Sequence, residues 1–321
     1  MFSSVDEFVP ATYRLDLVAD LVRFLNLPDE GHWMVKASNS NQGQGIEMCA
    51  NVAKFKKDIM TGKDKWADNV AEGEESGEGS TDIKEEVKKA ELKHVVKDLK
   101  DVMVQRYLEN PCLYKGRKFD MRAFMVVISA KPWFVYAHPG YTRVSLEQFT
   151  MDDFGQKTKE ARGRHLTNLA IQKKSPLWKD HKNDCVLTAE ELAAYLMEQG
   201  KVASVEDYHQ RVTSKINEIM RLMWLQIKDR LDRKFGCFEV FGFDFMLDES
   251  LNPHFLEVNM NPAMFCDTKV LSEMLPKLVS DCCNLAVEIH KDHKKEADVD
   301  TIRALLKDKC KLPYEELFAE V

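Results

Sequence analysis

The sequence lacks the segments that mark a membrane or secreted protein. No run of 18 apolar residues occurs, and the N-terminal stretch MFSSVDEFVPATYRL has no charged region followed by an apolar one. We therefore expect neither a membrane span nor a signal peptide. The motifs GxxxxGK[ST] and GxGxxG are also missing, which excludes a P-loop and a dinucleotide-binding fingerprint.

Paired cysteines and an excess of positive charge are missing too. None of the eight cysteines forms a CxxC pair, so the spacing suits neither a zinc ribbon nor a small disulfide framework. We expect reduced thiols, as in the cytoplasm. The net charge of −7 disfavours a globally basic nucleic-acid binder, although a local basic patch can still meet an acidic partner.

What the chain does contain is enough apolar sequence for a core and a mixture of helical and strand patterns. With 321 residues, 44% of them hydrophobic, it is long enough for two or three subdomains. Strands alternate with helices and several strands look antiparallel, which predicts an α+β (mixed α/β) fold. We expect helices at 13–27, within 188–233, at 269–292 and at 298–319, strands at 32–36, 46–52, 119–129 and 133–138, a strand leading into a linker over 102–111, and a hairpin over 237–261.

One segment differs in character from the rest. Residues 62–90 are acidic, rich in Gly and Ser, and poor in large apolar side chains. Such a segment buries too little surface to offset its ordering entropy, so we expect a mobile insertion. An acidic recognition segment is the alternative.

The strongest chemical signal is FGFDFMLDESLNPHFLEVNMNP, residues 241–262. Alternate strand residues share a face, so Glu257 and Asn259 lie together, and pairing as a hairpin brings Asp244 to them. Two carboxylates and an amide oxygen suit magnesium. Carboxylates on the wet face of a sheet are the competing interpretation. An aspartate within apolar sequence favours a site, because an unpaired buried charge is costly.

A second signal is GRKFDMRAFMVV, residues 116–127. Lys118, Asp120 and Arg122 share one strand face, and the apolar residues between them share the other. The apolar face can pack in a core while the charged face lines a cleft, where lysine and arginine hold phosphate or carboxylate. A solvated charged face is the simpler alternative.

Three weaker segments complete the candidates. Lys36 ends a strand before a loop in which Gly43 and Gly45 permit close approach to an anion. The stretch VQRYLENP can offer backbone groups to an adenine edge, framed by Gln105, Tyr107 and Leu108, or can be a plain linker. The motif HLTN follows the motif GYTRVS along the chain. In GYTRVS, Arg143 can hold a carboxylate. In HLTN, Thr167 and Asn168 can bind nucleotide or acceptor, and His165 is a base or a structural residue.

Taken together and in this order, several segments resemble the tubulin-tyrosine-ligase-like family, and within it the protein polyglycylases. They are PATYRL, WMVKASNSNQGQGI, VQRYLENPCLYKGRKFDMR, GYTRVS, HLTNLAIQKKSP, FGFDFMLDE and FLEVNMNP, and they span about residues 10 to 290. The resemblance implies an ATP-grasp fold whose central and C-terminal subdomains enclose a nucleotide cleft. It implies a remnant N-terminal helical segment at 1–30, since the family usually has a further lobe before PATYRL, a central subdomain at 31–107, a C-terminal subdomain at 108–292, and a helical tail at 293–321.

The resemblance also assigns roles to the candidate residues. It implies that Arg122, Arg143 and Lys118 serve catalysis, and that Asp244, Glu257 and Asn259 are magnesium ligands. The implied ATP contacts are Lys36, Gln42, Gly43, Gly45, Ile46, Gln105, Arg106, Tyr107, Leu108, Lys118, Asp120, Thr167 and Asn168.

The implied activity is an ATP- and magnesium-dependent ligation of an amino acid, glycine, to glutamate side chains of tubulin or another acidic protein. We expect a monomer in the cytoplasm, at the cytoskeleton or the axoneme of a cilium or flagellum, without nucleic-acid or membrane partners. Addition of glutamate or tyrosine, an inactive nucleotide- or tubulin-binding module, and a ligase for small carboxylic acids remain alternatives.

Overall fold

The computed structural model describes residues 2–37, 45–61, 95–97, 99–292, 298–310 and 313–320. The chain forms two compact units. The smaller unit comprises Pro10–Glu109 and Met151–Lys157, and the larger unit comprises Met1–Val9, Asn110–Thr150 and Thr158–Val321. The insertion predicted at 62–90 lies outside the described residues. Among the described helices, none combines the length and apolar character that crossing a bilayer requires.

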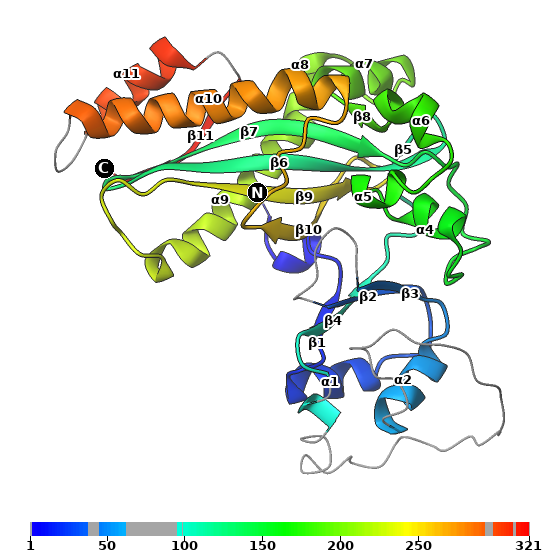
Figure 1. Ribbon diagram of the computed structural model, residues 1–321. Helices are drawn as coiled ribbons and strands as arrows, with labels where there is room; N and C mark the ends of the chain where they lie inside the picture. Colours follow the sequence, from blue (N-terminus) through cyan, green and yellow to red (C-terminus); the bar gives the residue numbers. More distant parts are fainter. Residues whose placement is uncertain are drawn as a thin grey trace. The chain divides into compact units, whose positions relative to one another are not determined.

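The smaller unit is an antiparallel sheet in the order β1-β4-β2-β3 with two helices (Figure 1). Its elements are β1 (Thr12–Arg14), α1 (Val18–Leu25), β2 (Trp33–Ala37), β3 (Ile46–Cys49), α2 (Val52–Thr61) and β4 (Val102–Arg106). Apolar residues of α1, α2, β2 and β4 form its core. The strand predicted at 32–36 is confirmed, and within 102–111 the strand ends at Arg106.

Two predicted boundaries in the smaller unit are wrong. The helix expected at 13–27 begins only at Val18, because Thr12–Arg14 pair with β4 as a strand. The strand expected over 46–52 ends at Cys49, since the Asn51 side chain accepts a hydrogen bond from the Lys54 backbone N–H and begins helix α2.

The larger unit is built on a seven-stranded sheet in the order β10-β9-β6-β7-β11, with β5 on β6 and β8 on β7. Its strands are β5 (Leu113–Tyr114), β6 (Arg117–Ala130), β7 (Trp133–Val144), β8 (Val186–Leu187), β9 (Glu239–Leu247), β10 (Pro253–Asn259) and β11 (Glu315–Ala319). The strands expected at 119–129 and 133–138 and the hairpin expected over 237–261 are confirmed.

Helices cover both faces of this sheet (Figure 1). The helices are α4 (Lys159–His165), α5 (Leu169–Gln172), α6 (Trp178–His181), α7 (Ala189–Glu198), α8 (Val205–Tyr208), α9 (Ser214–Ile227), α10 (Lys269–Asp292) and α11 (Val299–Lys309). The helices predicted within 188–233 and at 269–292 are confirmed; α7 begins with a capping box at Thr188 and Glu191.

Alternate side chains of strand β6 lie on opposite faces of the sheet and pack in two different core clusters. Its odd positions from Phe119 to Val127 pack in one core cluster, with residues of α7 and α9. Three of its even positions, Phe124, Val126 and Ile128, pack in a second cluster with residues of α10. The earlier even positions, at the beginning of the strand, are polar.

The helix expected at 298–319 is wrong in its second half. Helix α11 ends at Lys309, and Glu315–Ala319 form β11, which pairs antiparallel with β7. Pro313 disfavours a continuous helix, because the residue before a proline avoids helical angles. Leu317 then buries its side chain in the core beside β7.

Candidate functional site

The polar beginning of β6 lies opposite a buried aspartate of β9. Arg122 and Asp244 are directly opposed in the antiparallel pairing of the two strands. Their side chains form a two-point ion pair, in which Arg122 Nη2 lies 3.0 Å from Asp244 Oδ2 and Nε also donates to Oδ1. Both side chains are buried, which contradicts the alternative of a solvated charged face.

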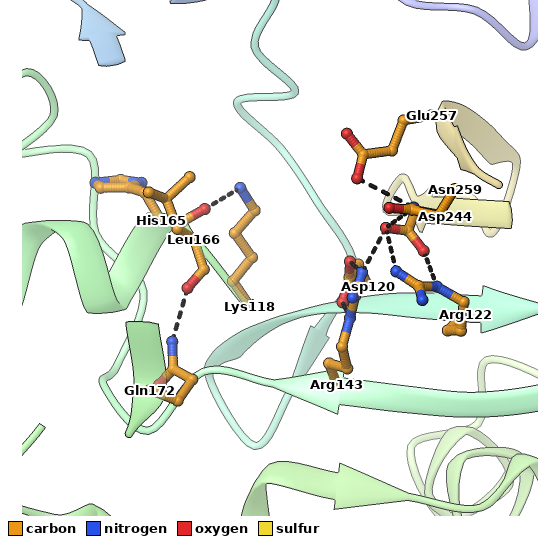
Figure 2. A network of polar contacts seen from close by, with 10 residues as sticks. All are labelled: Lys118, Asp120, Arg122, Arg143, His165, Leu166, Gln172, Asp244, Glu257 and Asn259. Carbon is orange, nitrogen blue, oxygen red and sulfur yellow. Dashed lines mark hydrogen bonds and ion pairs between the residues drawn. The ribbon is translucent and has the colours of Figure 1, made fainter. Parts of the chain in front are cut away.

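A second ion pair lies across the other edge of β6. Asp120 is directly opposite Arg143 of β7, and the two side chains again pair at two points. Arg143 Nη2 also lies 2.8 Å from Asp244 Oδ2. The four residues therefore form one continuous network across β7, β6 and β9 (Figure 2), which we call the arginine–aspartate network.

This network fixes the charge of its members. Burial alone would raise the pKa of Asp244, but the positive charges of Arg122 and Arg143 outweigh it, so its pKa lies well below the usual range. Burial lowers and the carboxylates raise the pKa of Arg143, with a net rise. Asp244, Arg122 and Arg143 therefore stay charged near neutral pH.

A β-bulge brings Glu257 to the network. Strand β10 pairs with β9 through Phe255 opposite Phe245, but after the bulge Glu257 lies opposite Asp244. Without this one-residue shift Glu257 would oppose Phe243 and point to the other face of the sheet.

Asn259 lies two residues beyond the bulge, on the same face as Glu257. Its Nδ2 is 3.3 Å from Glu257 Oε1 and 3.4 Å from Asp244 Oδ2. The three residues predicted as a metal set therefore converge, as Figure 2 shows. Glu257 and Asn259 are half-buried, whereas Asp244 is buried.

A glycine makes space for the arginine. A Cβ on Gly242 would lie 2.9 Å from Pro262 Cβ and 3.0 Å from Arg122 Cδ. Gly242 is opposite both Phe124 on β6 and Asn259 on β10, so it lies at the centre of the site. The sequence motifs do not single out Gly242; its place between Phe241 and Phe243 in a strand pattern is the available signal.

The remaining predicted residues of the larger unit are Thr167 and Asn168, between α4 and α5, and Lys118 of β6, whose side chain reaches that segment. Lys118 is buried, and its Nζ donates to the backbone carbonyl of His165 at 2.8 Å. Thr167 is buried and Asn168 half-buried; Asn168 precedes α5 without making a side-chain capping hydrogen bond. In Figure 2 the Lys118 ammonium points to this segment and lies apart from Glu257.

Within the smaller unit, Lys36 and Gln105 meet on neighbouring strands. Lys36 Nζ donates to Gln105 Oε1 at 2.7 Å, and Gln105 Nε2 donates to Thr12 Oγ1 at 3.0 Å. These hydrogen bonds fix the Lys36 ammonium next to Gln105 near the end of β4.

The other predicted contacts of the smaller unit differ in their setting. Tyr107 is buried against Phe154, with 4.7 Å between ring centroids, and Arg106 stacks on Trp33 and donates to the Glu30 carbonyl. Leu108 is half-buried, Gly45 adopts φ +67° and Ile46 begins β3. Gln42 and Gly43 lie outside the described residues.

The oxygen donors fit a magnesium ion. Glu257 offers a carboxylate and Asn259 offers an amide oxygen after rotation of its side chain, and magnesium is usually bound through one or two carboxylates together with phosphate oxygens and water. Asp244 supplies a second carboxylate, which is shared with two arginines. Within the described part of the chain no cluster of three His, Cys, Asp or Glu side chains offers an all-protein metal site.

Comparison with known proteins identifies the chain's relatives. The profile of the tubulin-tyrosine ligase family matches residues 3–296. The chain belongs to the tubulin-tyrosine ligase family. This confirms the resemblance drawn from the sequence motifs, and the mixed α/β fold with antiparallel sheets agrees with it.

Curated relatives within the tubulin-tyrosine ligase family include polyglycylases. The chain is 32% identical to "Protein polyglycylase TTLL10" of Rattus norvegicus over 288 residues, 88% of this chain and 39% of the relative. It is 30% identical to "Inactive polyglycylase TTLL10" of Homo sapiens, with the same shares covered. A more distant relative is "Probable alpha-tubulin polyglutamylase Ttll1" of Tetrahymena thermophila, 26% identical over 88% of this chain and 60% of the relative. The chain spans about two-fifths of the length of these polyglycylases.

Proposed function

We propose that this chain is an ATP- and magnesium-dependent ligase that joins an amino acid, glycine, to glutamate side chains of tubulin or another acidic protein. The observation that carries the proposal is the arginine–aspartate network beside Glu257 and Asn259, in a chain of the tubulin-tyrosine ligase family. Fixed positive charge next to oxygen donors is what a reaction between a carboxylate and a triphosphate requires.

We assign the metal to the three converging side chains. Glu257, Asn259 and Asp244 would hold magnesium, which when bound neutralises phosphate charge and polarises the phosphoryl group. We further propose that Lys118, Thr167 and Asn168 of the larger unit contact ATP.

The proposed reaction has two steps. An acceptor glutamate carboxylate attacks the γ-phosphorus of ATP, the bond to the β-phosphate oxygen breaks, and ADP leaves. The uncharged amine of glycine then attacks the carbonyl carbon of the acyl-phosphate, phosphate leaves with the bonding electrons, and the amine proton passes to solvent. An amide bond remains. No side chain of the protein acts as a nucleophile.

The network explains how such a reaction can proceed. The attacking carboxylate and the triphosphate repel each other, so the site must supply positive charge where negative charge accumulates. Arg122 and Arg143 present planar guanidinium groups that fit carboxylate or phosphate oxygens. Asp120 and Asp244 hold these arginines in one geometry before substrate arrives, which lowers the reorganisation that the reaction needs.

Two alternatives have specific support. The relative named a polyglutamylase favours glutamate as the added amino acid, and the human relative named inactive favours a binding module without turnover.

The test is to incubate the chain with MgATP, tubulin and one labelled amino acid at a time, followed by mass spectrometry of the acceptor and measurement of ADP. Arg122→Lys removes the two-point geometry, and Arg303→Lys, in an exposed two-point pair with Glu316, is its matched control.

Glycine-dependent acceptor modification and ADP release, lost in Arg122→Lys and kept in Arg303→Lys, is the expected result. Modification by glutamate or tyrosine alone would replace glycine in the proposal. Nucleotide binding without ADP release for any acceptor and amino acid would overturn the ligase assignment and support the binding module.

A further inference from the structure

The C-terminal end of α4 is held by side chains from three other segments. A helix leaves its last carbonyl groups without partners inside the helix, and these must be satisfied elsewhere. Here the Gly163 carbonyl accepts from Gln172 Nε2 at 2.7 Å and from Ser145 Oγ at 2.8 Å. The Leu166 carbonyl accepts from Gln172 Nε2 at 2.7 Å, and the His165 carbonyl accepts from Lys118 Nζ at 2.8 Å.

Both the nitrogen and the oxygen of the Gln172 side-chain amide form hydrogen bonds. Its Nε2 donates to two carbonyls of the α4 end, and its Oε1 accepts from the backbone N–H of Leu146 at 2.8 Å. The side chain is fully buried. It therefore links the segment that follows β7 to the end of α4, and it is the hydrogen-bond partner of the Leu166 carbonyl and of the Leu146 N–H.

The two hydrogen bonds from Gln172 Nε2 to the Gly163 and Leu166 carbonyls, which we call the clamp, enclose His165 in the chain. Figure 2 shows the contact of Gln172 with Leu166 and that of Lys118 with His165. Its own carbonyl is the acceptor for the Lys118 ammonium, at the helix end where the backbone dipole favours a positive charge. Gln172 does not bond to Lys118 directly; the His165 carbonyl connects them.

We propose that Gln172 is a positioning residue for Lys118: by clamping the end of α4 it holds the His165 carbonyl at the place that orients the lysine ammonium. One part of the inference rests on the proposed function, namely that the oriented ammonium binds a phosphate of ATP. Loss of the clamp removes the Gln172 partner of the Leu166 carbonyl and of the Leu146 N–H, while the Gly163 carbonyl keeps Ser145 Oγ, so the residues around His165 must move to satisfy the two buried groups.

The test uses substitutions that keep the volume of the side chain. Gln172→Met removes the amide and keeps the shape, and Gln172→Glu keeps the shape and one acceptor but loses both donors at neutral pH. Asn217→Leu is the matched control. Asn217 lies on α9 of the same unit, and its buried amide donates to Glu315 Oε2 at 2.7 Å.

The first readout is independent of ATP. The folded chain is treated with an amine-reactive reagent, and modification of Lys118 is followed by mass spectrometry of its peptides. We expect Lys118 to react slowly in the wild type and in Asn217→Leu, and roughly tenfold faster in both Gln172 variants, on the scale found for residues that orient a ligand. Equal rates in all four proteins, or an equal rise in the control, would overturn the positioning role.

The second readout is MgATP affinity. We expect Gln172→Met to weaken binding, Lys118→Met to weaken it more, and the double variant to be no weaker than Lys118→Met, because coupled residues are not additive. Additive losses would overturn the inference. If the wild type itself fails to bind MgATP, the proposed function fails, while Lys118 labelling still decides whether Gln172 positions the lysine.

Discussion

Arg122 and Asp244 lie directly opposite each other on neighbouring strands and form a buried two-point ion pair. A buried charge is tolerated only when a partner compensates it. Here Asp244 compensates two arginines, since Arg143 Nη2 also lies 2.8 Å from its carboxylate. The stability of the larger unit and the geometry of the site therefore depend on the same carboxylate.

The first prediction concerns this shared carboxylate. Asp244→Asn removes the negative charge and leaves two buried guanidinium groups with one remaining aspartate. We expect the free energy of unfolding of the larger unit to fall by about 3–5 kcal/mol, the usual cost of breaking a buried ion pair by removing one partner. Urea denaturation followed by far-ultraviolet circular dichroism measures this change.

Its control is Asp267→Asn, which breaks the surface pair between Asp267 and Lys173, whose atoms are 2.6 Å apart. Both side chains of that pair are more than one-third exposed, so we expect a loss below about 1 kcal/mol. Similar losses for the two variants would show that the network does not stabilise the fold as its burial indicates.

The second prediction concerns the space beside Arg122. Gly242→Ala places a Cβ 2.9 Å from Pro262 Cβ and 3.0 Å from Arg122 Cδ, so at least one of the two must shift. Overpacking of this kind costs about 1–3 kcal/mol. We expect that loss in unfolding free energy together with a fall in ADP release, because the guanidinium leaves its position.

Gly163→Ala tests whether any added methyl group has this effect. A Cβ on Gly163 would lie 3.8 Å from Glu147 Cγ, an ordinary contact distance. We expect this variant to keep wild-type stability and activity. An unchanged Gly242→Ala protein would mean that Arg122 does not require the space that the glycine leaves.

The residues that could be predicted from the sequence were those set by strict alternation. The pattern of β6 placed its odd positions in the core and its polar even positions on the other face, and both placements are found. The pairing of β9 with β10 followed from two strand patterns around a short turn. Helical periodicity likewise identified α10 and most of α7 to α9.

What could not be predicted depended on tertiary pairing. Alternation alone leaves Glu257 opposite Phe243; only the bulge after Phe255 brings it to Asp244. The sequence also does not indicate that Asp120 binds Arg143, since their contact requires the register between β6 and β7. The pattern of Glu315–Ala319 was interpreted as helical, because nothing local shows that the edge of β7 receives these residues as a strand.

The third prediction is a pH dependence that arises from His138. Burial lowers the pKa of His138 from 6.5 to about 4, and its Nδ1 accepts a hydrogen bond from the Gly140 N–H at 2.9 Å. Between these two values the unfolded chain binds a proton that the folded chain does not. Stability is therefore complete above pH 6.5 and falls as the pH decreases towards 4, by about 3 kcal/mol for this group.

Unfolding free energies measured from pH 7 to pH 4 test this dependence. His138→Gln keeps an acceptor for the Gly140 N–H but does not titrate, so we expect a shallower decline over that range. The exposed His181→Gln should retain the wild-type slope. A wild-type slope in the His138 variant would assign the acid sensitivity to other groups.

The measurement that bears most directly on the proposed ligase is MgATP binding and turnover by Glu257→Gln. This variant keeps the side-chain shape and an acceptor for Asn259 Nδ2, so the fold should remain intact. The exposed Glu273→Gln on α10 is its control. We predict that calorimetry shows MgATP binding by the wild type and the control, an affinity lower by roughly tenfold to a hundredfold in Glu257→Gln, and no ADP release by that variant. Wild-type affinity and ADP release in folded Glu257→Gln would contradict the account.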